Sequence, residues 1–114
     1  MSISKGEIGR IFNNATNFDL SGNSSLELIF TKPDGTEVTV TSASSPAVTA
    51  PAVALVNDPD IGDQDASTYF QYINTDAAFY DQAGVWTVCG VYVDATPKRY
   101  MQPAAIPFTV LDGC

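Results

Sequence analysis

Residues 25–42 read SLELIFTKPDGTEVTVTS, and every second residue is apolar on both sides of a short polar break. The apolar positions are Leu26, Leu28 and Phe30 before the break and Val38 and Val40 after it. Such alternation is typical of β-strands that bury one face. The break itself, Lys-Pro-Asp-Gly at residues 32–35, supplies a proline for the second turn position and a glycine for a positive φ. The segment therefore predicts a β-hairpin.

Period-two alternation returns in the second half of the chain. Residues 68–74 (TYFQYIN) predict one strand, and residues 85–93 (VWTVCGVYV) predict another. Both faces of the second segment are apolar, which indicates a central strand. Between the two, residues 75–83 predict one or two helical turns, because Thr75 can cap the N-terminus and Gly84 can end the helix.

These segments together predict an all-β protein. About seven short strands between turn residues are typical of an immunoglobulin-like antiparallel β-sandwich, and we expect one domain over residues 1–114. Six Phe, five Tyr and one Trp can fill the core of a chain of this size. We expect Trp86 in that core and allow Tyr69, Tyr80 and Tyr100 at the surface.

Charge and composition exclude several classes of function. The chain lacks histidine, so it cannot use a histidine-containing triad or a histidine-ligated zinc. Its net charge is −8, and residues 33–97 hold nine Asp and Glu but no Lys or Arg. So few cations argue against nucleic acid and membrane surfaces as partners. We expect no enzymatic activity, no catalytic residue and no cofactor.

Residues 42–56 (SASSPAVTAPAVALV) differ from the rest, because they are small, uncharged and contain two prolines. Two interpretations stay open: a loop that ends in an edge strand at residues 52–56, or an extended arm that contacts another protein. On the second interpretation the interface residues are Val48, Val53, Leu55 and Val56.

An acidic loop follows this arm at residues 57–65 (NDPDIGDQD), so the segment 42–66 combines both features. Alternating Asp58, Asp60, Asp63 and Asp65 could ligate calcium. Counted from Asp58, however, Gly62 falls at position five and Tyr69 at position twelve, where an EF-hand has glycine at six and glutamate at twelve. The favoured prediction is a solvated turn whose carboxylates bond nearby backbone groups, with no metal ligand.

The chain has two cysteines, Cys89 and Cys114. Free thiols are the favoured prediction, because Cys89 lies inside a predicted strand and Cys114 is the last residue. One bridge between them is the alternative.

Two segments resemble a known module. They are FDLSGNSSLELIFTKPDGTEV (residues 18–38) and YFQYINTDAAFYDQAGVWTVCGVYV (residues 69–93). In this order they resemble the immunoglobulin-like module of tailed-bacteriophage virion structural proteins, such as the N-terminal domain of baseplate upper proteins. Residues 83–88 (AGVWTV) are also similar to the Ala-Gly-x-Tyr-x-Cys signature of immunoglobulin domains, with Trp86 at the tyrosine position and Val88 at the cysteine position. Trp86 lacks the phenol that makes the corner hydrogen bond of those domains.

The resemblance implies a non-enzymatic virion component, made in the host cytoplasm and then incorporated into the particle. It would decorate or cement the capsid, or act as an adaptor on the neck, tail or baseplate. Its partners would be other virion proteins, from capsid or tail, and copies of itself. The alternative is an immunoglobulin-like binding module for a glycan or protein of the host surface, which would need a groove with exposed Tyr or Trp.

Overall fold

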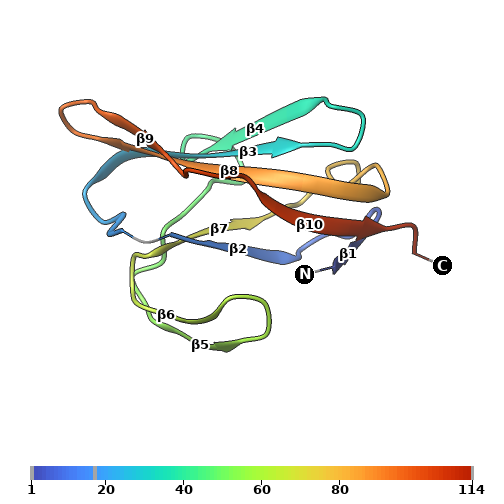
Figure 1. Ribbon diagram of the computed structural model, residues 1–114, viewed down its shortest axis with the longest axis horizontal. Helices are drawn as coiled ribbons and strands as arrows, with labels where there is room; N and C mark the ends of the chain where they lie inside the picture. Colours follow the sequence, from blue (N-terminus) through green and yellow to red (C-terminus); the bar gives the residue numbers. More distant parts are fainter. Residues whose placement is uncertain (1, 17, 114) are drawn as a thin grey trace.

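The computed structural model describes residues 2–16 and 18–113, and these residues form ten β-strands and no helix (Figure 1). The strands are β1 (Ser2–Ser4), β2 (Ile11–Ala15), β3 (Asn23–Thr31), β4 (Glu37–Thr41), β5 (Leu55–Asp58), β6 (Gly62–Gln64), β7 (Tyr69–Ile73), β8 (Gly84–Asp94), β9 (Arg99–Met101) and β10 (Ile106–Leu111). The all-β prediction is confirmed. The described part of the chain has no helix of the length and apolarity needed to span a membrane.

Most strands belong to one large sheet. Its order is β1-β10-β8-β3-β4, and β9 pairs with β8 as well. Strands β2 and β7 form a second, antiparallel sheet, and β5 and β6 form a separate hairpin. Figure 1 shows the β2–β7 sheet as a layer below the large sheet, which makes the arrangement sandwich-like.

The large sheet is mixed, whereas the sequence predicted an antiparallel one. Strand β1 runs parallel to β10, with Ile3 opposite Val110. Ile3 is fully buried, so the N-terminal segment covers the edge of the sheet beyond β10. A strand of three residues carries too weak an alternation to be predicted.

The hairpin predicted at residues 25–42 is confirmed as β3 and β4. Leu28 lies opposite Val40, and Phe30 lies opposite Val38. In the turn, the Gly35 N–H donates to the Lys32 carbonyl (2.9 Å) with φ of 90° at Gly35. The predicted glycine thus takes the conformation that the turn requires.

Strand β8 is central, as predicted, because it lies between β3 and β10. Trp86 is fully buried, and its indole Nε1–H donates to the Gln82 carbonyl at 2.8 Å. Gly90 on the same face lies directly under the Phe70 ring of the second sheet. The absence of a side chain at this position lets the two sheets approach.

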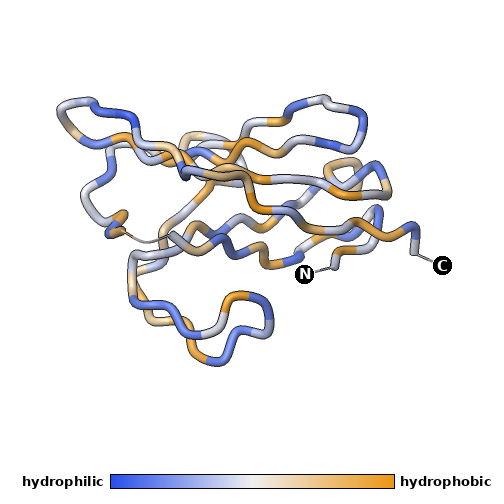
Figure 2. Tube along the Cα trace, viewed as in Figure 1, coloured by the Kyte–Doolittle hydropathy of each residue, from blue (hydrophilic) through white to orange (hydrophobic). Residues whose placement is uncertain are grey.

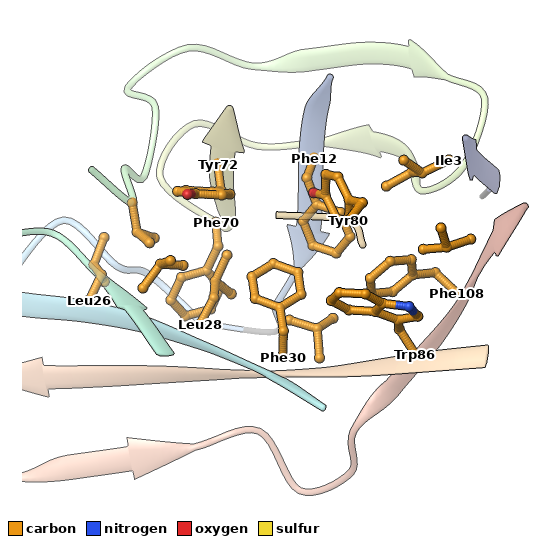
Figure 3. Packing of buried hydrophobic residues seen from close by; sticks show 14 of the residues in the cluster. Ile3, Phe12, Leu26, Leu28, Phe30, Phe70, Tyr72, Tyr80, Trp86 and Phe108 are labelled. Atoms are coloured by element: carbon orange, nitrogen blue, oxygen red, sulfur yellow. The ribbon is translucent and has the colours of Figure 1, made fainter. Parts of the chain in front are cut away.

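An aromatic core fills the space between the sheets. In Figure 3 the large sheet directs Leu26, Leu28, Phe30 and Trp86 toward Phe12, Phe70, Tyr72 and Tyr80. Phe30 lies at the centre, with its ring 5.3 Å from Phe12 and 5.2 Å from Phe79 between centroids. Burying each large apolar side chain stabilises the fold by about 1.5–3 kcal/mol. The hydropathy colouring alternates along the strands accordingly (Figure 2).

The helical turns predicted at residues 75–83 are wrong. The Asp76 carboxylate accepts the Ala78 N–H (2.9 Å) and the Asp76 carbonyl accepts the Phe79 N–H (3.1 Å), so the segment makes a single turn. Phe79 and Tyr80 then pack edge to face at 4.8 Å and both contact Trp86. Packing of both rings against Trp86 thus outweighs the local preference for helix.

Two of the three tyrosines allowed at the surface are buried. Tyr80 lies among core aromatics, where burial raises the pKa of its phenol well above the ordinary value. Tyr69 is covered on the outer side of β7, and its hydroxyl donates to the Val53 carbonyl at 3.1 Å. Tyr100 on β9 is exposed, as expected. Cys89 carries a free thiol, while Cys114 lies outside the described residues.

Candidate functional site: the arm and the β5–β6 hairpin

The arm of residues 42–56 begins by running along β7. Thr49 and Gln71 exchange both backbone hydrogen bonds, at 3.0 and 2.8 Å, and the Ser67 N–H donates to the Pro51 carbonyl at 2.8 Å. The strand expected at residues 52–56 forms slightly later, as β5. The first half of the arm therefore uses its backbone within the chain.

Val48 does not belong to the interface that the sequence predicted. Its side chain is 2% exposed and lies in the hydrophobic core. Because Thr49 pairs with β7, alternation along the arm turns Val48 and Ala50 toward the interior. Val48 thus stabilises the fold and offers no surface to a neighbour.

The second half of the arm is accessible. Val53 is 64% exposed and Val56 is 68% exposed, while Leu55 is half-buried and pairs with Gln64 of β6. The hydrogen bond from Tyr69 to the Val53 carbonyl holds this end of the arm against β7. Three of the four predicted residues, Val53, Leu55 and Val56, therefore lie close together in sequence at the base of an exposed hairpin.

Carboxylates of the acidic loop organise the hairpin turn, as predicted. Asp58 Oδ1 accepts the N–H groups of Asp60 (2.9 Å) and Ile61 (3.0 Å), and Asp63 Oδ1 accepts the Asn57 N–H (2.7 Å). Burial raises the pKa of Asp58, but these N–H groups and the Asn13 amide outweigh burial and lower it overall. Among the described residues, no group of three or more His, Cys, Asp or Glu side chains could hold a metal ion.

A groove of about 760 Å³ separates this hairpin from the β2–β7 sheet. Figure 1 shows the hairpin standing away from that sheet. Leu55 and Asp58 line one wall, and Ile8 and Ile11 line the other. One hydrogen bond crosses near the turn, from Asn13 Nδ2 to Asp58 Oδ2 at 3.3 Å.

The sheet side of the groove carries apolar residues that the sequence did not single out. Ile11 is 53% exposed and lies opposite Ile73 in the β2–β7 ladder, and Ile8 is exposed nearby in the chain. The available signal was the alternation in residues 11–15, which buries Phe12 and Asn14 and must turn Ile11 outward. The structure thus brings the arm and the outer face of the second sheet together around one groove.

The chain matches no family model, no curated protein and no solved structure. No family assignment therefore indicates a function, and the functional proposal rests on the geometry of the hairpin and its groove.

Proposed function

We propose that this chain is a non-enzymatic structural subunit of a bacteriophage virion, which decorates or cements the capsid or serves as an adaptor on the neck, tail or baseplate. Its contacts with neighbouring virion proteins, and with copies of itself, are made by the β5–β6 hairpin and the groove beside it. The observation that carries the proposal is the exposure of Val56 on that hairpin and of Val53 just before it.

The strand order supports an immunoglobulin-like module. In immunoglobulin variable domains, strands G, F, C and C′ are neighbours in one sheet and face the sheet that contains B and E. The order β10-β8-β3-β4 facing β2–β7 fits that pattern. The Trp86 indole also donates to a backbone carbonyl four residues upstream, so a tryptophan supplies the hydrogen bond that a corner tyrosine would make.

The exposure of apolar side chains indicates that the hairpin binds another subunit and is not only a loop surrounded by water. Val53 and Val56 lie three residues apart where the hairpin begins, and both are more than half exposed. Ile11, across the groove from Leu55, is exposed as well. Monomeric proteins scatter such residues singly, whereas neighbouring ones mark interaction sites. A neighbour that covered the hairpin would remove them from water.

Charge indicates the kind of neighbour. A net charge of −8 opposes self-association at low ionic strength. Copies of the chain should therefore separate in dilute solution and assemble on a partner with a positive surface, or at raised salt.

The test is a pair of substitutions that leaves the core intact. Deleting the whole arm would remove Val48, so the variant to use is Val53→Ser combined with Val56→Ser. Val85→Ser is the control, because Val85 is 61% exposed but lies on β8 in the other sheet.

We expect the free energy of unfolding of both variant proteins to stay within about 0.5 kcal/mol of the wild-type value. The double variant should be lost from purified particles, while the control remains at wild-type occupancy. Wild-type occupancy of the double variant would refute the role of the hairpin.

A second candidate is a binding module for a host glycan or protein. The observation that favours it is the exposure of Tyr100 next to Tyr92, because such a module needs accessible aromatic side chains.

A further inference from the structure

Figure 1 shows the chain just before β3 and the β8–β9 hairpin at the same end of the sandwich. A second hollow lies there, lined from both segments. It has a volume of about 400 Å³. Its lining residues are Phe18, Asp19, Tyr92, Asp94 and Tyr100. None of them lines the groove beside the β5–β6 hairpin, so this hollow is a separate site.

Three aromatic rings form its wall. Tyr92 lies between the other two, with ring centroids 5.8 Å from Phe18 and 5.6 Å from Tyr100. Tyr92 and Tyr100 are cross-strand partners in β8 and β9, and their rings are inclined by 35°. Tyr100 is 44% exposed, so a ligand can reach the ring faces.

Two carboxylates flank this wall. Asp94 Oδ1 accepts the N–H groups of Thr96 (2.9 Å) and Lys98 (2.7 Å), and these bonds, with the Thr96 hydroxyl, lower the pKa of Asp94 to about 2. Asp19 accepts the N–H and the hydroxyl of Ser21, both at 2.9 Å, which lowers its pKa as well. Both side chains therefore carry full negative charge at neutral pH.

No cation of the described residues neutralises these charges. The ion pairs formed within residues 2–16 and 18–113 involve other carboxylates, and Arg99 of β9 is paired with Glu27 at 3.5 Å. The Lys98 contact with Asp94 comes from its backbone. The hollow thus combines accessible aromatic faces with two uncompensated negative charges.

We propose that this hollow binds a guanidinium group, presented as an arginine side chain by a partner protein. Aromatic faces attract cations, and a guanidinium stacks on a ring while its edge donates two hydrogen bonds to a carboxylate. A neutral sugar fits less well, because it would leave both carboxylate charges unpaired, and the Tyr100 hydroxyl that could serve it already donates to Asp94 Oδ2 at 3.4 Å. The net charge of −8 also favours a basic partner.

The experiment is an NMR titration of the whole chain with the peptide acetyl-Ser-Arg-Ser-amide. The matched probe replaces arginine by citrulline, which has the same shape without the charge. We expect the arginine peptide to shift the ring signals of Tyr92 and Tyr100 and to bind at least about tenfold more tightly than the citrulline peptide. Methyl glycosides, titrated in the same way, should cause no saturable shift.

Variants locate the binding. Tyr100→Leu should weaken the arginine peptide about threefold to fivefold. Tyr100→Phe keeps the ring and loses only the 3.4 Å hydrogen bond from its hydroxyl to Asp94 Oδ2, so it should bind within about twofold of wild type. Asp19→Asn keeps an acceptor for Ser21 and should weaken binding about threefold. Asp65→Asn is the control, because it removes the same charge outside the hollow.

Three results would overturn the proposal. One is equal binding of the arginine and citrulline peptides, which would remove the role of charge. Another is an equal loss in Asp19→Asn and Asp65→Asn, which would reduce the effect to general electrostatics. The third is saturable binding of a glycoside in place of arginine, which would make the hollow a sugar site.

Discussion

Replacing Trp86 by alanine tests the core of the fold. The side chain is fully buried on β8 and packs against Phe79, Tyr80 and Phe108, with ring centroids 5.8–6.4 Å apart. Emptying a buried aromatic site costs about 3–5 kcal/mol. Losing the indole hydrogen bond to Gln82 adds about 1 kcal/mol.

The expected loss in the free energy of unfolding is therefore about 4–6 kcal/mol, the sum of the cavity and hydrogen-bond contributions. Since a domain of this size has a total of about 5–15 kcal/mol, the variant should be close to unfolding. Urea denaturation should be followed by far-UV circular dichroism, because Trp86 is the single tryptophan and its fluorescence disappears with it.

Two further variants keep this test decisive. Trp86→Phe retains much of the ring packing and should lose about 1.5–3 kcal/mol, so it gives a value even if the alanine variant does not fold. Val85→Ala changes the exposed neighbour on the same strand and should lose less than about 0.5 kcal/mol. A loss below about 1 kcal/mol for Trp86→Ala would refute the assignment of this residue to the core.

Three further predictions follow from single contacts. Gly90→Ala would place a Cβ inside the Phe70 ring, so the free energy of unfolding, measured by urea denaturation, should fall by about 3 kcal/mol. An unchanged free energy of unfolding would contradict the close approach of the two sheets at this position. The hydrogen bonds of Asp94 lower its pKa to about 2 in the folded protein, against an ordinary 3.8. The ionised carboxylate therefore stabilises the fold above about pH 4, and this stabilisation is lost as the pH falls toward 2. The melting temperature of Asp94→Asn should consequently fall less than that of wild type over this interval; an identical fall would contradict the assignment. Millimolar calcium should leave the melting temperature unchanged, because Asp58 and Asp63 already accept backbone N–H groups. A rise of several degrees with calcium but not with magnesium would show that the acidic loop binds metal.

The parts of the fold that could be predicted depend on local signals. The β3–β4 hairpin follows from alternation on both sides of a Pro-Asp-Gly turn, and the central position of β8 follows from its two apolar faces. Both signals lie within a few residues of the structure they specify.

The mistaken predictions share a non-local cause. Val48 looked available because its neighbours are small, but pairing of Thr49 with β7 turns it into the core. The cap and stop residues around 75–83 favoured helical turns, but packing of Phe79 and Tyr80 against Trp86 overrides them. In each case a tertiary contact outweighs a local preference.

The candidate sites divide in the same way. Exposure of Val53 and Val56 could be expected from a run of small residues that lacks a core of its own. The groove that Leu55 shares with Ile11 could not be expected, because it requires the hairpin to be placed beside the second sheet. Likewise, Tyr100 was a surface candidate by sequence, but only the fold brings Phe18 and Asp19 beside it.

A cryo-electron microscopy reconstruction of phage particles purified from cells that produce this chain tests the central claim most directly. The account predicts that the side chains of Val53 and Val56 are covered by a neighbouring subunit in every occupied position. Absence of the chain from purified particles, or a β5–β6 hairpin that faces solvent in all copies, would contradict it.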